Sequence, residues 1–351
     1  MAQGTHRSRH IQVMPQTSFV VPDNTAGKRL DAWLAAQLEN VSRARVQLLL
    51  SESKVLVNGS LAKSSLKLRG GETVEILGDP APPPLHATPE AISLDIVYED
   101  KDLSVINKPA GMMVHAGSGA TDDARNQGTL VNALLGHYGE LSQSHDLVRP
   151  GIVHRLDKQT SGLIIIARND TAHLRLAEMF SRRQIRKTYL ALVHGFIRQE
   201  HGTINAPISR DAIRRTRMTT RRETGARSAI SHYDVLERID SRFGKFTLAS
   251  VRIETGRTHQ IRVHLASIGH PVVGDTLYGA PAKIPSITPR KKNTPAPETL
   301  SLGRNFLHAA ELEFAHPITG KQLHLRAPLP LQLADFRQKL SSAGTQSVTR
   351  T

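Results

Sequence analysis

The chain has 351 residues, and its 46 Lys and Arg exceed its 31 Asp and Glu, which gives a formal net charge of +15. This excess favours a polyanionic partner, and nucleic acid is favoured over a membrane because no long apolar run or lipidation signal is present. The absence of cysteine excludes disulfides, thiol catalysis and Cys-ligated zinc, and it fits a reducing compartment. We therefore expect a cytoplasmic protein, long enough for two domains, with a nucleic-acid partner and no membrane partner.

The first folded unit is predicted at 18–78. The segment before it, 1–17, is basic and lacks the apolar stretch of a secretory signal, so we interpret it as a disordered tail, with an RNA-binding arm as the alternative. Apolar residues at i, i+3, i+4 and i+8 predict an amphipathic helix that begins at Leu30. Ser42 is a plausible N-cap for a second helix, and two short strands follow around the turn at Asn58.

Two helices followed by Lys-Val-Leu-Val-Asn-Gly resemble the S4 RNA-binding domain. In that family the second helix and the turn present cations to RNA. The resemblance therefore implies RNA contacts for Arg43, Arg45 and Lys54 in a small α/β domain. The alternative is that these are ordinary solvated surface charges.

Composition predicts the remaining boundaries. Residues 79–93 are rich in proline and predict a semi-rigid linker. A second domain is expected at 94–335, and within it 280–305 combines five prolines with a basic run, which predicts an exposed insertion loop. Residues 336–351 are interpreted as a C-terminal tail.

The first motif of the second domain is Lys-Pro-Ala-Gly, which starts at Lys108 and is followed by Met-Met-Val-His. A proline followed closely by glycine marks a sharp turn at which a backbone can approach a ligand. Lys108 is a candidate RNA-binding residue, although the motif alone also fits a turn with a surface lysine.

The second motif, HRLDKQTSGL, contains an isolated carboxylate. Asp157 is the only acid between Asp146 and Asp170, and it precedes an apolar run that predicts a buried strand. Neighbouring cations should keep this carboxylate ionised at the edge of the core, where it can act as a nucleophile or a base. The alternative is a structural ion pair. His154 and Arg155 of the same motif are candidate substrate contacts.

Residues 188–195 alternate as a strand that places Tyr189 on one face. A tyrosine in a strand usually packs in a core, so this position is ambiguous without further information.

The segment 208–222 carries six arginines and one acid, without an apolar period. We expect an exposed loop or hairpin that binds phosphates in a salt-dependent manner, through Arg214, Arg215 and Arg217 among others. A solvated charged loop is the alternative.

The third motif is GRTHQIRVHLASIGHPVVGD, which begins at Gly256. It predicts a helix at 259–268, capped by Thr258, with a buried stripe that ends at Ile268. The free amides at its start, together with Arg257, suit an anion. A metal site is not expected, because His259 and His264 are five residues apart and diverge on a helix.

Together these motifs resemble those of the RluA-type pseudouridine synthases, and they are most similar to the RluD-like enzymes of large-subunit ribosomal RNA. The resemblance implies an α+β catalytic domain around a mixed, mostly antiparallel sheet. It also implies that Asp157 is the catalytic carboxylate, that Tyr189 stacks on the target uracil, and that a basic residue pairs with Asp157. We expect Arg262 in that last role, with Arg257 as the second choice, and we expect Arg155 to contact the flipped nucleotide.

The implied reaction is the isomerisation of uridine to pseudouridine in RNA, with ribosomal RNA as the favoured target and no cofactor or metal. The alternatives are a synthase that acts on tRNA, a non-catalytic S4-type RNA-binding or ribosome-assembly protein, and a carboxylate-nucleophile hydrolase. The expected oligomeric state is a monomer.

Overall fold

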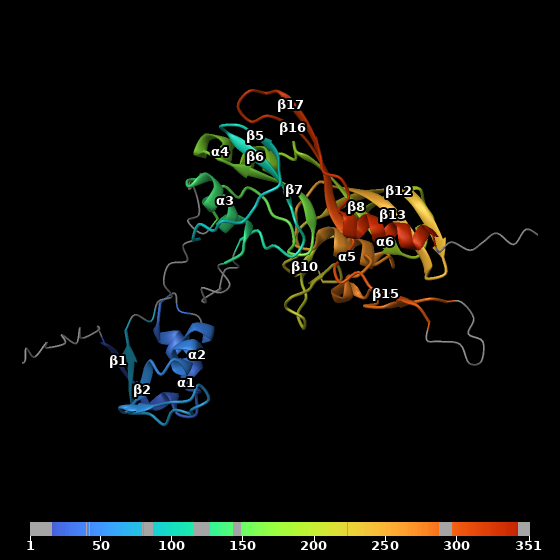
Figure 1. Cartoon of the computed structure of the whole chain (residues 1–351). Helices are drawn as coiled ribbons and strands as arrows, with labels where there is room; N and C mark the ends of the chain where they lie inside the picture. Colours follow the sequence, from blue (N-terminus) through green and yellow to red (C-terminus); the bar gives the residue numbers. More distant parts are fainter. Residues whose placement is uncertain are drawn as a thin grey trace, which may run out of the picture. The chain divides into compact units, whose positions relative to one another are not determined.

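The computed structural model describes residues 16–39, 41, 43–78, 80, 87–115, 127–142, 149–222, 224–287 and 297–342. They fall into two compact units, one containing the described residues up to 80 and the other those from 87 onward (Figure 1). Most of the predicted N-terminal tail, Ser42, part of the predicted linker and the middle of the insertion loop lie outside the described residues. Among the described residues, no helix combines the length and apolarity that a membrane span requires.

The first unit packs two helices on a four-stranded antiparallel sheet of order β1-β4-β2-β3. Its strands alternate between buried and partly exposed positions, as Val74 and Ile76 of β4 illustrate, because only one face of the sheet meets the helices. Its elements are β1 (Gln16–Val20), a 3-10 turn η1 (Asp23–Thr25), α1 (Leu30–Gln37), α2 (Arg43–Ser51), β2 (Val55–Val57), β3 (Ser60–Leu61) and β4 (Thr73–Leu77).

The second unit is built on a nine-stranded sheet of order β5-β6-β7-β16-β8-β13-β12-β9, with β17 paired to β16. Only β7 and β16 run parallel, so the predicted α+β class with a mixed, mostly antiparallel sheet is confirmed. The strands are β5 (Ile96–Glu99), β6 (Leu103–Lys108), β7 (Ser161–Ala167), β8 (Arg186–His194), β9 (His201–Asn205), β12 (Ile230–Ser241), β13 (Gly244–Ile253), β16 (Leu307–Ala315) and β17 (Gln322–Arg326).

The helices of the second unit lie against the sheet: α3 and α4 near the β5–β7 end, and α5 and α6 near β8, β12 and β13 (Figure 1). Two small hairpins complete the unit. The helices are α3 (Leu130–Tyr138), α4 (Asp170–Ser181), α5 (Gln260–Ser267), α6 (Leu331–Ser342) and the 3-10 turn η3 (Thr276–Tyr278). The hairpins pair β10 (Ser209–Arg210) with β11 (Met218–Thr219), and β14 (Ile284–Pro285) with β15 (Thr299–Leu300).

Strand β7 is central to the fold because it follows the loop that carries Asp157. All seven of its residues are buried, as expected of an uninterrupted apolar run between two neighbouring strands. Gly162 has φ +113°, and a Cβ at this position would overlap the carbonyl oxygen of Ala309. Only glycine therefore permits the close parallel contact between β7 and β16.

Several predicted boundaries differ from the structure. Thr88 and Glu90, assigned to a spacer, hydrogen-bond to Asn132 of α3 and so belong to the second unit. The C-terminal tail predicted from residue 336 begins inside α6, whose Phe336 and Leu340 are buried. These two side chains, four residues apart, pack on the sheet and hold the helix to its end at Ser342.

Candidate active site

A cavity of about 590 Å³ opens where the loop before β7, the end of α4, β8 and the start of α5 meet. Its size falls in the range of about 300–1,000 Å³ that is usual for ligand sites. Two of its lining residues are carboxylates, Asp157 and Glu254, whereas six are lysine or arginine, so the site favours an anionic ligand. These six are Arg149, Arg155, Arg183, Lys187, Arg257 and Arg262.

Asp157 faces this cavity and pairs with Arg262, 105 positions later in the sequence. Its Oδ2 accepts a hydrogen bond of 3.0 Å from Arg262 Nη1, and the Nε2 of His259 lies 4.0 Å from the same oxygen. The carboxylate side chain remains 21% exposed, so it is oriented by its partner and still accessible to a substrate. Of the two basic residues considered from the sequence, the structure pairs Arg262, and not Arg257, with Asp157.

The guanidinium of Arg262 is held by a second carboxylate. Its Nε and Nη2 donate to Asp275 at 2.6 and 2.9 Å, and the ring centre of Tyr278 lies 5.1 Å from its Cζ. Burial alone would lower the pKa of Arg262, but the hydrogen bonds and negative charges of Asp275 and Asp157 outweigh burial and raise it. Arg262 is therefore a fixed cation beside Asp157.

Helix α5, which supplies Arg262, begins differently from the sequence-based expectation. Its N-cap is His259, which has φ +57°, and not Thr258. Gln260 caps the preceding turn instead, because its Oε1 accepts from the Arg257 amide at 3.1 Å. Ile268, expected on the buried stripe, is 38% exposed because the helix ends one residue earlier.

Tyr189 and Lys187 lie two residues apart on β8 and both line the cavity. Burial, and then the charge of Asp157, raise the pKa of Tyr189, so its hydroxyl stays protonated at neutral pH. Burial lowers the pKa of Lys187 to about 8. Among the described residues no carboxylate pairs with Lys187, and its ammonium lies 5.2 Å from the ring centre of Phe180.

Arg155, Arg257 and His154 also line the cavity, but they are not equivalent. Arg155 is exposed, and Arg257 uses its Nε to donate to the Ser228 carbonyl at 3.2 Å. His154 Nε2 accepts from the Ile165 amide at 2.8 Å, and burial, together with Lys187, lowers its pKa to about 3. His154 is therefore neutral at pH 7, so it offers no charge to a phosphate.

The expected RNA contact of Lys108 is wrong. Its side chain is fully buried, and Nζ donates to the carbonyls of Pro109 and Met112 at 2.8 and 2.9 Å. Burial, followed by repulsion from Arg304, lowers its pKa to about 7. Lys108 therefore organises the loop after β6 from inside the protein, a burial that the sequence pattern of a lysine before a turn does not reveal.

The other predicted RNA-binding arginines and lysines are not among the residues that line the cavity. Arg214, Arg215 and Arg217 lie in the turn region between β10 and β11, where the first two are exposed.

In the first unit, three residues were expected to contact RNA. Arg43 is exposed and pairs with Asp31 at 3.0 Å, Lys54 pairs with Glu52 at 2.7 Å, and Arg45 is buried. Arg45 is thus less available than expected, because its Nε faces the Pro80 carbonyl.

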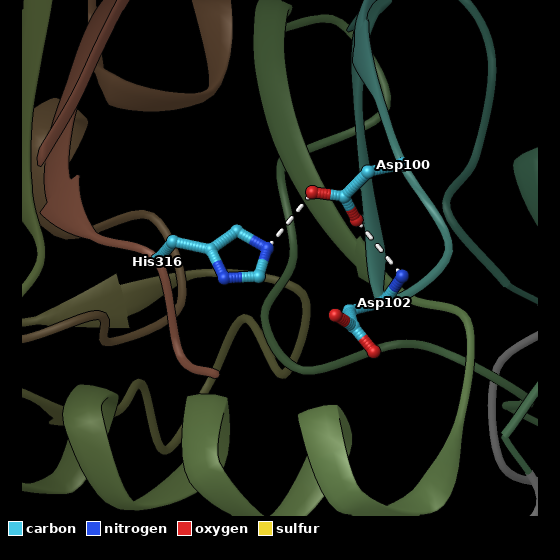
Figure 2. Close-up of side chains that lie close together, drawn as sticks. All are labelled: Asp100, Asp102 and His316. Atoms are coloured by element: carbon cyan, nitrogen blue, oxygen red, sulfur yellow. Dashed lines mark hydrogen bonds and ion pairs between the residues drawn. The ribbon is translucent and has the colours of Figure 1, made fainter. Parts of the chain in front are cut away.

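A separate cluster of Asp100, Asp102 and His316 has a spacing that could suit a cation (Figure 2). However, His316 Nδ1 accepts from the amides of Ile318 and Thr319 at 3.2 and 3.1 Å, which leaves the ring hydrogen on Nε2. That Nε2 lies 2.8 Å from Asp100 Oδ2. Figure 2 marks this contact with a dashed line between the two side chains. The cluster is therefore explained as a close polar contact between the turns after β5 and β16.

Three side chains of the site were not assigned from the sequence: Lys187, Asp275 and Tyr278. A signal for Asp275 was present, because it is the only acid between Glu254 and Glu298. The same isolation had identified Asp157. No comparable signal distinguishes Tyr278, whose position is set by the turn η3.

Comparisons with known proteins show which families the two parts of the chain resemble. Residues 102–267 match the family model described as RNA pseudouridylate synthase, and 28–74 match the S4 domain. An uncharacterised RNA pseudouridine synthase of Bacillus subtilis is 40% identical over 94% of this chain and 100% of that protein. The ribosomal large subunit pseudouridine synthase D of Nitrosomonas europaea is 41% identical over 95% of this chain and 90% of that protein. The structure of human RNA pseudouridylate synthase domain containing 1 matches with a TM-score of 0.50 and 25% identity, over 74% of this chain and 98% of the human one.

Proposed function

The chain belongs to the RNA pseudouridylate synthase family, and from that premise we propose that it isomerises specific uridines of large-subunit ribosomal RNA. The family resemblance expected from the motifs, including the S4 domain, is confirmed by the matches to both family models. The relatives that are named for the large ribosomal subunit support the choice of ribosomal RNA over tRNA. We place the reaction in the cytoplasm, by a monomer.

In this proposal the target uridine leaves its stack and enters the cavity, at a cost of a few kcal/mol. The bond between N1 and C1′ breaks, the uracil turns, and C5 bonds to C1′. The hydrogen on C5 is lost as a proton and N1 gains one, so the atoms balance without a redox cofactor. Asp157 acts as the nucleophile or as the base that leads to a glycal.

The other roles follow from the geometry. Arg262 orients Asp157 through the 3.0 Å hydrogen bond and balances its charge. Tyr189 presents its ring to the uracil and keeps its hydroxyl protonated, because burial and Asp157 raise its pKa. Arg155, Lys187 and Arg257 supply positive charge for the phosphates of the flipped nucleotide and its neighbours.

One observation carries the proposal: the isolated carboxylate of Asp157 faces a cavity rich in cations and is paired with the fixed cation Arg262. A module that only binds RNA has no use for a carboxylate at this place, because it would repel phosphate.

The test is the release of tritium from ribosomal RNA that carries 5-tritiated uridine, with naked RNA and with immature large subunits. We expect Asp157→Asn to lower release on the order of 10²–10⁴-fold, the range for loss of a catalytic base, while RNA binding is retained. Asp240→Asn, at an exposed position of β12, is the matched control and should react as wild type. No tritium release by the wild-type protein from either substrate would favour a non-catalytic RNA-binding protein. Equal release by the wild-type and Asp157→Asn proteins would show that Asp157 is not needed for the reaction.

A further inference from the structure

The hydroxyl of Tyr278 connects the arginine-rich hairpin to the residues around Asp157. Tyr278 ends the turn η3 and is 4% exposed. Its oxygen accepts a hydrogen bond of 2.9 Å from the amide of Met218, the first residue of β11, and lies 3.0 Å from His259 Nδ1. One hydroxyl thus contacts both the hairpin and the N-cap of the helix that carries Arg262.

The ring of Tyr278 makes a parallel connection. Its centre lies 5.2 Å from the guanidinium carbon of Arg217, on the hairpin, and 5.1 Å from that of Arg262. Both distances suit cation–π attraction. Met218 also packs against the small apolar cluster that contains Tyr278, so a displacement of β11 would also shift the Tyr278 ring.

The hydrogen bonds of the Tyr278 hydroxyl favour one tautomer of His259. Because the Met218 amide donates to the Tyr278 oxygen, the hydroxyl hydrogen is free to donate to His259 Nδ1. The imidazole hydrogen then lies on Nε2, the atom 4.0 Å from Asp157 Oδ2. His259 has φ +57°, a left-handed conformation that is unfavourable for a non-glycine residue and that the contact with Tyr278 helps to hold.

We infer that Tyr278 is a positioning residue that couples RNA docking on the β10–β11 hairpin to the placement of Arg262 and His259 around Asp157. The hairpin presents Arg214 and Arg215 to solvent, where phosphates can bind them. Docking would then fix β11, and the Met218 amide would fix the Tyr278 hydroxyl. This inference rests on the proposed isomerisation in RNA and adds to it a route from binding to chemistry.

The experiment is a double-mutant cycle on single-turnover pseudouridine formation, with the RNA dissociation constant measured separately. The variants are Tyr278→Phe, which keeps the ring and removes the hydroxyl, the double variant Arg214→Ala/Arg215→Ala, and their combination. We expect Tyr278→Phe to lower the rate at saturating RNA about tenfold and to leave the dissociation constant within about twofold. The arginine substitutions should lower the saturating rate about fivefold in the wild-type background and less than about twofold in the Tyr278→Phe background.

Two controls separate positioning from general damage. Tyr138→Phe also removes a hydroxyl hydrogen bond, to Ser104 on β6 away from the cavity lining, and should leave the saturating rate unchanged. If Tyr278→Phe unfolds at the assay temperature, Arg217→Ala tests the same route from the hairpin side. It should lower the saturating rate, whereas Arg221→Ala should change only affinity.

The coupling would be overturned if the rate losses of the single variants multiply in the combined variant, or if Tyr278→Phe reacts at the wild-type rate. If Tyr278→Phe unfolds, equal saturating rates for Arg217→Ala and Arg221→Ala would overturn it instead. A wild-type protein that forms no pseudouridine at all would instead refute the proposed function. The two failures are therefore distinguishable.

Discussion

Asp275 binds two nitrogens of the Arg262 guanidinium, at 2.6 and 2.9 Å, and this leaves Nη1 directed at the carboxylate of Asp157. Asp275 is 3% exposed and Arg262 is 9% exposed. A bidentate pair of this kind fixes the plane of the guanidinium as well as its position. Asp275 therefore holds Arg262 in the orientation that pairs with Asp157, which reduces the reorganisation needed for reaction.

Asp275→Asn should weaken catalysis without removing any group that touches the substrate. An amide oxygen can accept from one nitrogen of Arg262, whereas the amide NH₂ repels the other, so the guanidinium is no longer fixed. We expect the single-turnover rate at saturating RNA to fall about 10–100-fold, with a small change in affinity. The free energy of unfolding should fall by about 3 kcal/mol, because a buried ion pair loses one charge.

The matched variant is again Asp240→Asn, which removes an exposed carboxylate from β12. Both proteins are compared well below their unfolding temperatures, so that only folded protein is assayed. An Asp275→Asn protein that is less stable but turns over at the wild-type rate would show that Asp275 has a structural role alone.

The sequence predicted local elements better than their arrangement. The apolar run after Gly162 was predicted as a buried strand, and β7 is buried along its whole length. Its neighbour could not be predicted from local pattern, because His308 of β16 pairs with Ser161 across 147 positions of sequence. Helix α6 was missed as a core element because only three of its twelve residues are buried.

The site shows the same division. Asp157 was identified by its isolation among cations, and Arg262 through a family motif, since nothing local reveals a contact between residues 105 positions apart. Lys108 was assigned to RNA because the sequence shows its charge and not its burial. Asp275 was passed over although it is as isolated as Asp157, because the motif containing it was interpreted through its histidines and arginines alone.

Lys108 predicts a pH dependence of stability. Burial lowers its pKa to about 7 in the folded protein, whereas the unfolded value is near 10.5. Below pH 7 both states hold the proton and the desolvation cost is fully present. As the pH rises through 7 the folded state releases its proton first, so the free energy of unfolding increases up to about pH 10.5.

Lys108→Met removes this dependence together with the hydrogen bonds to the carbonyls of Pro109 and Met112. The cost of the substitution, measured by urea unfolding, should therefore grow on the order of 2 kcal/mol between pH 7 and pH 9. Lys101→Met, at an exposed turn position, should change the free energy of unfolding by the same small amount at pH 7 and at pH 9. A cost for Lys108→Met that is constant with pH would mean that the buried ammonium stays charged throughout.

The hairpin between β10 and β11 predicts a change in the salt dependence of RNA binding. Asp211 Oδ1 accepts from the amides of Ile213 and Arg214, both at 2.9 Å, and this orders the turn that exposes Arg214 and Arg215. If each arginine binds one phosphate, Arg214→Ala/Arg215→Ala should reduce the slope of log affinity against log salt by about 1.4–1.8. Affinity should weaken most at low salt, where the release of counterions contributes most.

The control for this prediction removes the same two charges elsewhere. Arg326 of β17 pairs with Glu311 at 3.1 Å, and Arg337 of α6 pairs with Glu237 at 2.7 Å, so both are already neutralised within the protein. Arg326→Ala/Arg337→Ala should leave the slope within about 0.3 of wild type, because no phosphate contact is lost. Equal slopes for the two double variants would place the RNA elsewhere, since the effect would then follow net charge and not the hairpin.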